Sequence, residues 1–297
     1  MGQTSHEVAP LVVTPVAGSI GAQIDGLDLR EPLSDEQVSA VHDALMRHLV
    51  VFFRDQDLSD EQHLAFASRF GAPNVYPATR ARGLEEPIEW IEDTPDSPPK
   101  ADLWHTDAAF LAEPPDIAVL NMRVVPPVGG DTLWVNLYEV HDALSPAMQH
   151  AIADLELDLH PGEFFEEKIT LQFGHEVYEH IEHEFRGAHH PLVRVHPVTG
   201  RRALYMCGAY VRGIVDMHPH ESEVLLWLLR EGLGDPNFQC RWHYREHDVV
   251  MWDERCTNHR AVGDHFPHRR LVRRCTVGAG KPIGRREATM TGKVTRR

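Results

Sequence analysis

Hydrophobic residues fall into many short runs along this chain, and only a few segments show the spacing of an amphipathic helix. The run at 49–53 is apolar throughout and is followed by charged residues, which predicts a strand buried on both faces. Other short runs predict strands at 117–122, 133–135, 192–195, 203–206, 239–244, 249–252 and 270–277. We therefore expect a core made mainly of β-sheet.

Two helix starts are marked by a serine and a glutamine three residues apart. In Ser34 with Gln37, and again in Ser59 with Gln62, each side chain can satisfy a free backbone N–H group of the other residue. An apolar stripe follows the first pair and predicts a helix that packs on the core.

Further helices are predicted at 145–154, where a serine precedes a proline, and at 219–232. The residues expected to face inward from the second of these helices are Val224, Leu225, Leu228 and Leu229. Residues 161–190 are rich in glutamate, histidine and aromatic residues with weak periodicity, so we expect a flap there. Residues 1–10 and about 281–297 are polar and are expected to be flexible tails.

The chain shows no internal repeat, no low-complexity tract and no clear linker. Many short strands with a few helices at the start and at insertions favour an α+β fold with a closed or sandwich-like β core. Residues 1–297 are therefore expected to form a single domain.

Composition narrows the possible partners. With 297 residues, 42% of them hydrophobic and 25% charged, the sequence is typical of a globular protein. The formal net charge of -16 argues against binding to nucleic acid or to an anionic membrane surface. No apolar run approaches the length of a membrane span, and the four cysteines show no zinc spacing. We expect a cytoplasmic protein.

Candidate metal ligands lie in the segment around Trp104-His105-Thr106-Asp107. In an extended strand, His105 and Asp107 point to one face while Trp104 and Thr106 point to the other. A further imidazole, His259, would complete a set of two histidines and one carboxylate, which suits iron(II) and leaves coordination positions open. In a chain with 21 histidines, such a pair also arises by chance, so other motifs have to support the assignment.

The last predicted strand carries two arginines on one face. Period-two alternation places Arg270 and Arg274 on the same side as Val272 and Thr276. Buried arginines need anions, because an unpaired buried charge costs several kcal/mol. The two arginines therefore either face solvent or salt-bridge partners, or they face the metal site and bind anionic ligands there.

Over nearly its whole length the sequence resembles the taurine dioxygenase family of iron(II)- and 2-oxoglutarate-dependent oxygenases. The resemblance rests on motifs that occur in the family's order and with matching gaps. They are Trp104-His105-Thr106-Asp107, Gly129-Gly130-Asp131-Thr132, His196-Pro197-x-x-Gly200, Trp252-Asp253-x-Arg255-x-Thr257-x-His259, Arg270 and Arg274.

The resemblance implies a double-stranded β-helix core, of the jelly-roll or cupin type, with flanking helices. It implies that His105, Asp107 and His259 hold Fe(II), and that Arg270 and the Thr132 hydroxyl bind the distal carboxylate of the co-substrate 2-oxoglutarate. O2 is then consumed, succinate and CO2 are released, and an unactivated C–H bond of a small anionic substrate is hydroxylated. Family members also suggest a homo-oligomer, either a dimer or a tetramer.

For the primary substrate, the resemblance implies that Arg274 binds the anionic head. Tyr76 and Tyr210 match aromatic positions of the substrate pocket, although either residue could equally serve packing. A sulfonate, an alkyl sulfate or a carboxylate would fit such a site. The sequence departs from the taurine enzyme at Pro73, Ala101 and Cys207, so taurine itself is not predicted.

Three alternatives remain to be weighed. In the cluster around His175 and His180, the histidines are five residues apart, which does not match the four-residue spacing of a zinc hydrolase. A halogenase of the same superfamily needs a small residue where Asp107 stands. A non-catalytic 2-oxoglutarate or ligand-binding protein of the same fold would keep the site without the reaction.

Overall fold

The computed structural model describes residues 11–99 and 101–290. Its helices are α1 (Asp35–His48), α2 (Asp60–Ala67), α3 (Pro77–Ala81), α4 (Leu137–Asp142), α5 (Pro146–Ile152), α6 (Gly162–Phe173), α7 (His175–Glu184), α8 (Pro219–Glu231) and α9 (Arg285–Met290). Its strands are β1 (Val12–Pro15), β2 (Ala22–Asp25), β3 (Val50–Phe53), β4 (Glu89–Asp93), β5 (Pro115–Val124), β6 (Thr132–Asn136), β7 (Glu156–Leu159), β8 (Ala188–Pro191), β9 (Val193–Val195), β10 (Arg202–Leu204), β11 (Val211–Ile214), β12 (Gln239–Trp242), β13 (Val249–Asp253), β14 (Thr257–Ala261) and β15 (Arg270–Ala279).

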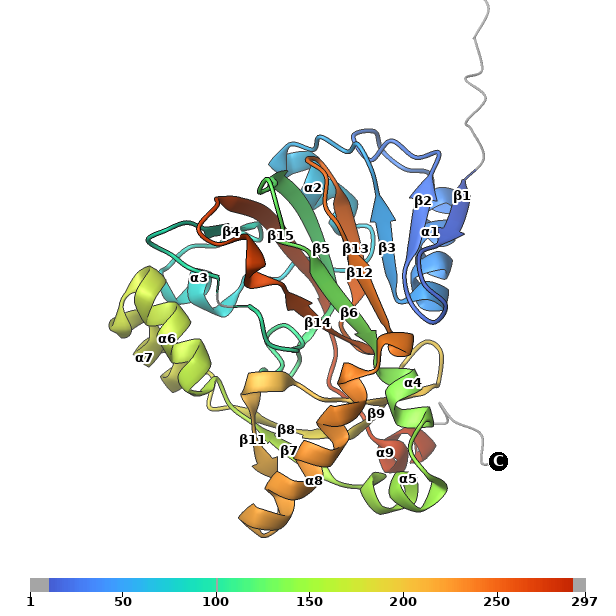
Figure 1. Cartoon of the computed structure of the whole chain (residues 1–297), viewed down its shortest axis with the longest axis vertical. Helices are drawn as coiled ribbons and strands as arrows, with labels where there is room; N and C mark the ends of the chain where they lie inside the picture. The colour runs from blue at the N-terminus through green and yellow to red at the C-terminus, as the bar shows by residue number, and fades with distance from the viewer. Residues whose placement is uncertain (1–10, 100, 291–297) are drawn as a thin grey trace, which may run out of the picture.

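A seven-stranded sheet forms one side of the β core. Its strand order is β1-β2-β3-β13-β5-β15-β4, and its pairs are antiparallel except for β2 with β3. Smaller sheets lie on the other side of the core, namely β12-β6-β14, β11-β7-β8 and the hairpin β9-β10 (Figure 1). Neighbouring strands come from distant parts of the chain, as the jelly-roll prediction requires.

Strict alternation of buried side chains gives the large sheet a hydrophobic core on each face. In β3, Val50 and Phe52 belong to the core between the sheets, whereas Val51 and Phe53 belong to the outer core beneath α1 and α2. The prediction that this apolar run is a strand buried on both faces is therefore confirmed.

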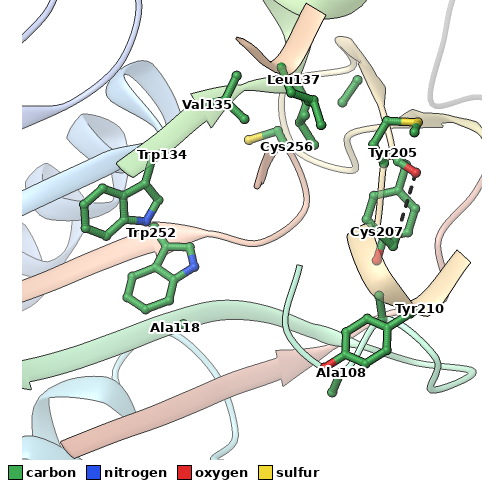
Figure 2. Packing of buried hydrophobic residues seen from close by; sticks show 14 of the residues in the cluster. Ala108, Ala118, Trp134, Val135, Leu137, Tyr205, Cys207, Tyr210, Trp252 and Cys256 are labelled. Atoms are coloured by element: carbon green, nitrogen blue, oxygen red, sulfur yellow. Dashed lines mark hydrogen bonds between the residues drawn. The ribbon is translucent and has the colours of Figure 1, made fainter. Parts of the chain in front are cut away.

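Large aromatic residues fill the space between the sheets. Trp134 from β6 and Trp252 from β13 lie beside one another, with ring centroids 5.8 Å apart (Figure 2). Phe52 packs edge-on to Trp134 and stacks on Trp242. This rigid packing lies directly below the candidate site, because the ring of Trp252 is 5.0 Å from that of His259.

Both capping boxes form as the sequence predicts. The Ser34 hydroxyl accepts from the backbone N–H of Gln37, and the Gln37 side chain accepts from the backbone N–H of Ser34. Ser59 and Gln62 repeat the arrangement at the start of α2. These two helices cover the outer face of the large sheet.

Two details of the helical predictions are wrong. Val224 and Leu228 of α8 were expected to face inward, but they are 52% and 44% exposed, while Leu226 and Leu229 are buried. Six consecutive apolar residues follow Glu223, so periodicity alone cannot select the buried stripe. The hydroxyl of Ser222 accepts from the backbone N–H of Ile214. This hydrogen bond holds the Ser222 side of α8 against β11 and so sets which apolar residues face the core.

The predicted C-terminal tail is also shorter than expected. Residues 285–290 form α9, which contacts β9, and Arg285 and Arg286 form ion pairs with Asp154. Ala288 is completely buried. The rest of the predicted tails, 1–10 and 291–297, lies outside the described residues.

Residues 161–190, for which no regular structure was predicted, contain α6 and α7. Leu171 and Phe173 are 52% and 38% exposed, which obscures the helical period in the sequence. These two helices lie on one side of the molecule beside α3 (Figure 1). Among the described residues, no helix is both long enough and apolar enough to cross a membrane.

Loss of one capping box should measurably destabilise the fold. Ser34→Ala leaves the backbone N–H of Gln37 without its partner, so we expect the free energy of unfolding to fall by about 1 kcal/mol in urea denaturation. Ser39→Ala makes the same chemical change at an exposed position inside the helix, where alanine is favourable. Equal destabilisation by both variants would contradict the role of the cap.

Candidate active site

The two segments that carry the candidate metal ligands are joined by one isolated antiparallel bridge. The backbone N–H of His105 donates to the carbonyl of His259 over 3.0 Å, and the reciprocal bond is 2.9 Å. His259 lies in β14, which the central strand β6 holds in register. The extended backbone predicted for the His105 segment is thus limited to a single bridge, after which Asp107 begins a turn.

The side chains of His105, Asp107 and His259 converge. The Nε2 atoms of the two histidines each lie 3.8 Å from Asp107 Oδ1, and the ring centroids are 4.1 Å apart. One atom from each residue can therefore contact a common ion. These three residues are the set that the sequence predicts.

The donor set fits a divalent transition metal. Nδ1 of His105 lies 2.7 Å from the carbonyl of Leu103, which orients the ring with Nε2 toward Asp107. A fixed Nδ1–H group of this kind is typical of metal-binding histidines. Asp107 Oδ2 is buried without a hydrogen-bond partner among the described residues, so it is available to a ligand. Two imidazoles and one carboxylate form the facial set that suits iron(II).

Protonation states also favour metal binding. Burial lowers the pKa of His105 and His259, so both imidazoles are neutral near pH 7. Burial opposes ionisation of Asp107, but the positive charge of Arg274, together with the interactions of His259, His105 and Glu254, outweighs burial and holds the pKa of this carboxyl well below its ordinary value. Neutral histidines and an ionised carboxylate are the forms that bind metals.

Hydrogen bonds to the turn between β13 and β14 and to β14 itself hold the turn after His105 in place. Thr106 points away from the ligands, and its hydroxyl donates to the carbonyl of Thr257 and accepts from the Asn258 amide. The backbone N–H of Asp107 donates to Glu254, which is completely buried and also accepts from the indole N–H of Trp252. Burial and the adjacent charge of Asp107 raise the pKa of Glu254.

The first arginine of β15 lies beside the predicted threonine. Nε of Arg270 donates to the carbonyl of Gly130, and its guanidinium lies 5.6 Å from the ring of Tyr244. The hydroxyl of Tyr244 donates to the hydroxyl of Thr132. Gly130 has φ 74°, and a Cβ atom there would lie 3.2 Å from the Arg270 side chain, which explains a glycine at this position.

The second arginine is tightly enclosed. Nη1 of Arg274 donates to Asp107 Oδ1 over 2.5 Å, while Nε and Nη2 donate to Glu89 Oε2 over 3.1 and 2.7 Å. Glu89 lies directly opposite Arg274 on the neighbouring strand β4. Arg274 therefore contacts the candidate metal site through Asp107, and Arg270 is buried on the same face of β15. Burial excludes the solvent-facing alternative for both, although each has a carboxylate nearby, Glu89 and Asp107 for Arg274 and Asp93, at 3.9 Å, for Arg270.

Tyr76 and Tyr210 are both buried close to Arg274. The guanidinium carbon of Arg274 lies 5.3 Å from the ring of Tyr76. Phe165 of α6 packs against both tyrosines, with ring centroids 6.3 and 6.1 Å apart. Helix α6 thus covers the pocket. The cluster of His175 and His180 is exposed on α7, where its ion pairs with glutamates are those of a protein surface.

Another group of possible ligands, His196, Asp253 and Cys256, is completely buried. Asp253 already accepts three hydrogen bonds from Arg255, one of them from its backbone N–H, and one from His196. Because its carboxylate is satisfied, this group stabilises the turn between β13 and β14. The motif Trp252-Asp253-x-Arg255 therefore supports the metal site from beneath.

Several residues beside the site carry no clear signal in the sequence. Glu89 and Glu254 follow no recognisable motif, and their roles depend on strand pairing that joins positions more than a hundred residues apart. Tyr244 ends a predicted strand, and only the fold shows that it faces Thr132. Glu254 lies in the turn after β13, and its place in the charged run Asp253-Glu254-Arg255 directly after an apolar strand was the one available signal.

The family model described as taurine catabolism dioxygenase TauD, TfdA family matches residues 12–276. The chain belongs to the TauD/TfdA dioxygenase family. It is 32% identical to an alkylsulfatase of Acinetobacter baylyi over 92% of this chain and 87% of that protein. It is also 32% identical to an alpha-ketoglutarate-dependent sulfate ester dioxygenase of Pseudomonas putida over 95% and 94% of the two chains.

Solved structures agree with this assignment. A taurine dioxygenase from Burkholderia xenovorans superposes on this dioxygenase with a TM-score of 0.78 at 32% identity, covering 93% of this chain and 92% of that one. The enzyme AAD-2, solved with Mn(II) and N-oxalylglycine, gives a TM-score of 0.77 at 30% identity over 92% and 99% of the chains. The predicted family, fold class and enzyme class, a 2-oxoglutarate (alpha-ketoglutarate)-dependent iron dioxygenase, are confirmed.

Removal of one candidate ligand should strongly weaken metal binding in this dioxygenase. We expect His259→Ala to weaken Mn(II) binding by more than about 10-fold in calorimetric titration, because one of three protein ligands is lost. His175→Ala removes an exposed imidazole of α7 and serves as the matched control. Undiminished binding by the His259 variant would show that the metal lies elsewhere.

Proposed function

We propose that this dioxygenase couples the oxidative decarboxylation of 2-oxoglutarate to hydroxylation of an unactivated C–H bond in a small organic anion. One O2 is consumed, and succinate, CO2 and the hydroxylated product are released. The single observation that supports this most strongly is that β15 carries two buried arginines on one face, of which Arg274 contacts Asp107 of the His105–Asp107–His259 group.

In this proposal, His105, Asp107 and His259 hold the iron, and bound iron supplies the oxidising chemistry. Leu103 fixes the tautomer of His105 through its carbonyl. Packing by Trp252 and α6 keeps the site dry, which strengthens the electrostatic interactions within it.

Arg270 and Thr132 are the proposed ligands for the distal carboxylate of 2-oxoglutarate. Nε of Arg270 is tied to Gly130, and Nη1 lies 3.9 Å from Asp93 Oδ2, so the guanidinium is held in place and its Nη groups are the proposed donors to a carboxylate. Thr132 is oriented by the hydroxyl of Tyr244 and can use its own hydroxyl as a donor. Bound 2-oxoglutarate would thus be held at a fixed distance from the metal ligands.

Arg274 is the proposed ligand for the anionic head of the primary substrate, with Tyr76 and Tyr210 lining its pocket. A cavity of about 410 Å³ adjoins Tyr76 and is lined in part by Leu111, Phe185 and Thr276, which suits an apolar tail. Several relatives are named for sulfate esters, sulfonates or phenoxypropionate, and this supports an organic sulfate, sulfonate or carboxylate as substrate.

Three further properties remain predictions. A single domain over the chain, a cytoplasmic location and a dimeric or tetrameric state are suggested by sequence and family. A non-catalytic ligand-binding protein of the same fold is the weaker alternative, because the complete ligand group and the buried arginines would then serve no reaction. Oxygen consumption in the presence of iron and 2-oxoglutarate distinguishes the two.

A substrate panel tests the proposed function. Purified protein with Fe(II), ascorbate and 2-oxoglutarate should release succinate slowly alone and at least about 10-fold faster with its substrate among alkyl sulfates, sulfonates and aryloxy or other carboxylic acids. Succinate is measured directly, and His259→Ala should give none. Absence of succinate from the wild-type protein under every condition would refute the proposed function.

Substitution of Arg274 should affect binding of the primary substrate and leave binding of 2-oxoglutarate intact. We expect Arg274→Ala to raise KM for the primary substrate by about 10-fold to 100-fold, because a charge-assisted hydrogen-bonded contact is lost, while slow uncoupled release of succinate persists. Arg269→Ala, which removes an exposed arginine immediately before the same strand, is the control. If substrate affinity were unchanged, the role assigned to Arg274 would be wrong.

A further inference from the structure

The charge of Arg274 is already balanced before any substrate enters. Its guanidinium lies between Glu89 and Asp107, and both carboxylates are largely buried, with side-chain exposures of 16% and 4%. A bound metal ion would take up the charge of Asp107, but Glu89 would still offset Arg274. A substrate anion in this pocket therefore approaches a pair that is close to neutral. Burial of that anion is unfavourable unless another positive charge lies nearby.

Lys168 supplies a further positive charge beside this pocket. It lies on α6 three residues after Phe165, so the two side chains share the helix face that covers the pocket. Phe165 contacts Tyr76 and Tyr210, the two aromatic residues beside Arg274. Lys168 also lines a small cavity together with Asp93 and Arg270, between α6, β4 and the start of β15.

The ammonium group of Lys168 is available to a ligand. Among the described residues, it forms no hydrogen bond or ion pair. Burial, followed by the positive charge of Arg274, lowers the pKa of Lys168, while the charges of Glu89 and Asp107 act in the opposite direction. A partly buried lysine without a partner is unfavourable, so an anion that bound it would be stabilised.

We propose that Lys168 is a second cation for the anionic head of the primary substrate, which it binds together with Arg274. This inference rests on the proposed function and makes the substrate class narrower. A sulfate ester or a sulfonate has three terminal oxygens, enough to accept from the guanidinium and from the ammonium group at once. A carboxylate has only two, so the pair of cations favours the sulfur anions. Glu89 acts as the counter-ion that keeps Arg274 oriented.

The experiment compares two charge changes of opposite sign. Protein loaded with Mn(II) and N-oxalylglycine is titrated calorimetrically with hexyl sulfate, 1-hexanesulfonate and hexanoate. We expect Lys168→Gln to weaken binding of the two sulfur anions by about 10-fold to 100-fold and that of hexanoate by less, because a charged contact is lost. Glu89→Gln removes the competing carboxylate of Arg274 and should tighten binding of all three.

Controls separate a binding role from a structural one. Lys168→Arg restores the cation and should recover most of the affinity, and Lys281→Gln, at an exposed lysine, should have no effect. KM for 2-oxoglutarate in the uncoupled reaction should be the same in Lys168→Gln as in the wild type. A raised KM would place Lys168 in the co-substrate site and would overturn the inference.

Two other results would also overturn it. One is unchanged affinity of Lys168→Gln for hexyl sulfate and hexanesulfonate. The other is a wild-type protein that releases succinate in the uncoupled reaction but binds neither compound. Failure of the proposed function itself looks different, since the wild-type protein would then release no succinate from 2-oxoglutarate at all.

Discussion

The site depends on one short antiparallel bridge, in which the backbones of His105 and His259 exchange two hydrogen bonds. Their side chains leave the bridge on the same face and approach Asp107 from two directions. The bridge attaches a loop to β14, and β14 is held by β6 in the interior. The three candidate ligands come from distant segments of the chain. Their side chains can hold a fixed geometry only if the backbones of these segments are themselves held together by hydrogen bonds.

Buried charge determines how the pocket is used. Arg270, Arg274 and Lys168 bring positive charge to a region from which water is largely excluded, and Asp93, Glu89 and Asp107 offset it. Each of these cations lies beside a carboxylate or beside a cavity. The pocket is thus arranged so that an incoming anion exchanges one set of ionic partners for another, and the cost of burying its charge is reduced.

Helix α6 joins the hydrophobic and the polar parts of this arrangement. Phe165 closes the aromatic wall around Tyr76 and Tyr210, and one turn later the same face presents Lys168. A segment of this kind has weak periodicity in sequence because its buried face mixes aromatic, apolar and charged residues. Residues that cover a ligand site contact the ligand as well as the core, so they need not follow the apolar period of a helix that packs only on a core.

Local chemistry in the sequence was enough to determine the capping boxes at Ser34 and Ser59, the buried strand β3, the alternation of β15 and, through its motifs, the residues that converge as the candidate ligand group. These features depend on near neighbours or on a fixed period. Only the tertiary structure decided which stripe of α8 is buried, that α9 is ordered, and that Glu89, Glu254, Tyr244 and Lys168 belong to the site. The reason is physical: these roles arise from pairing and packing between segments far apart in the chain, for which no local pattern exists.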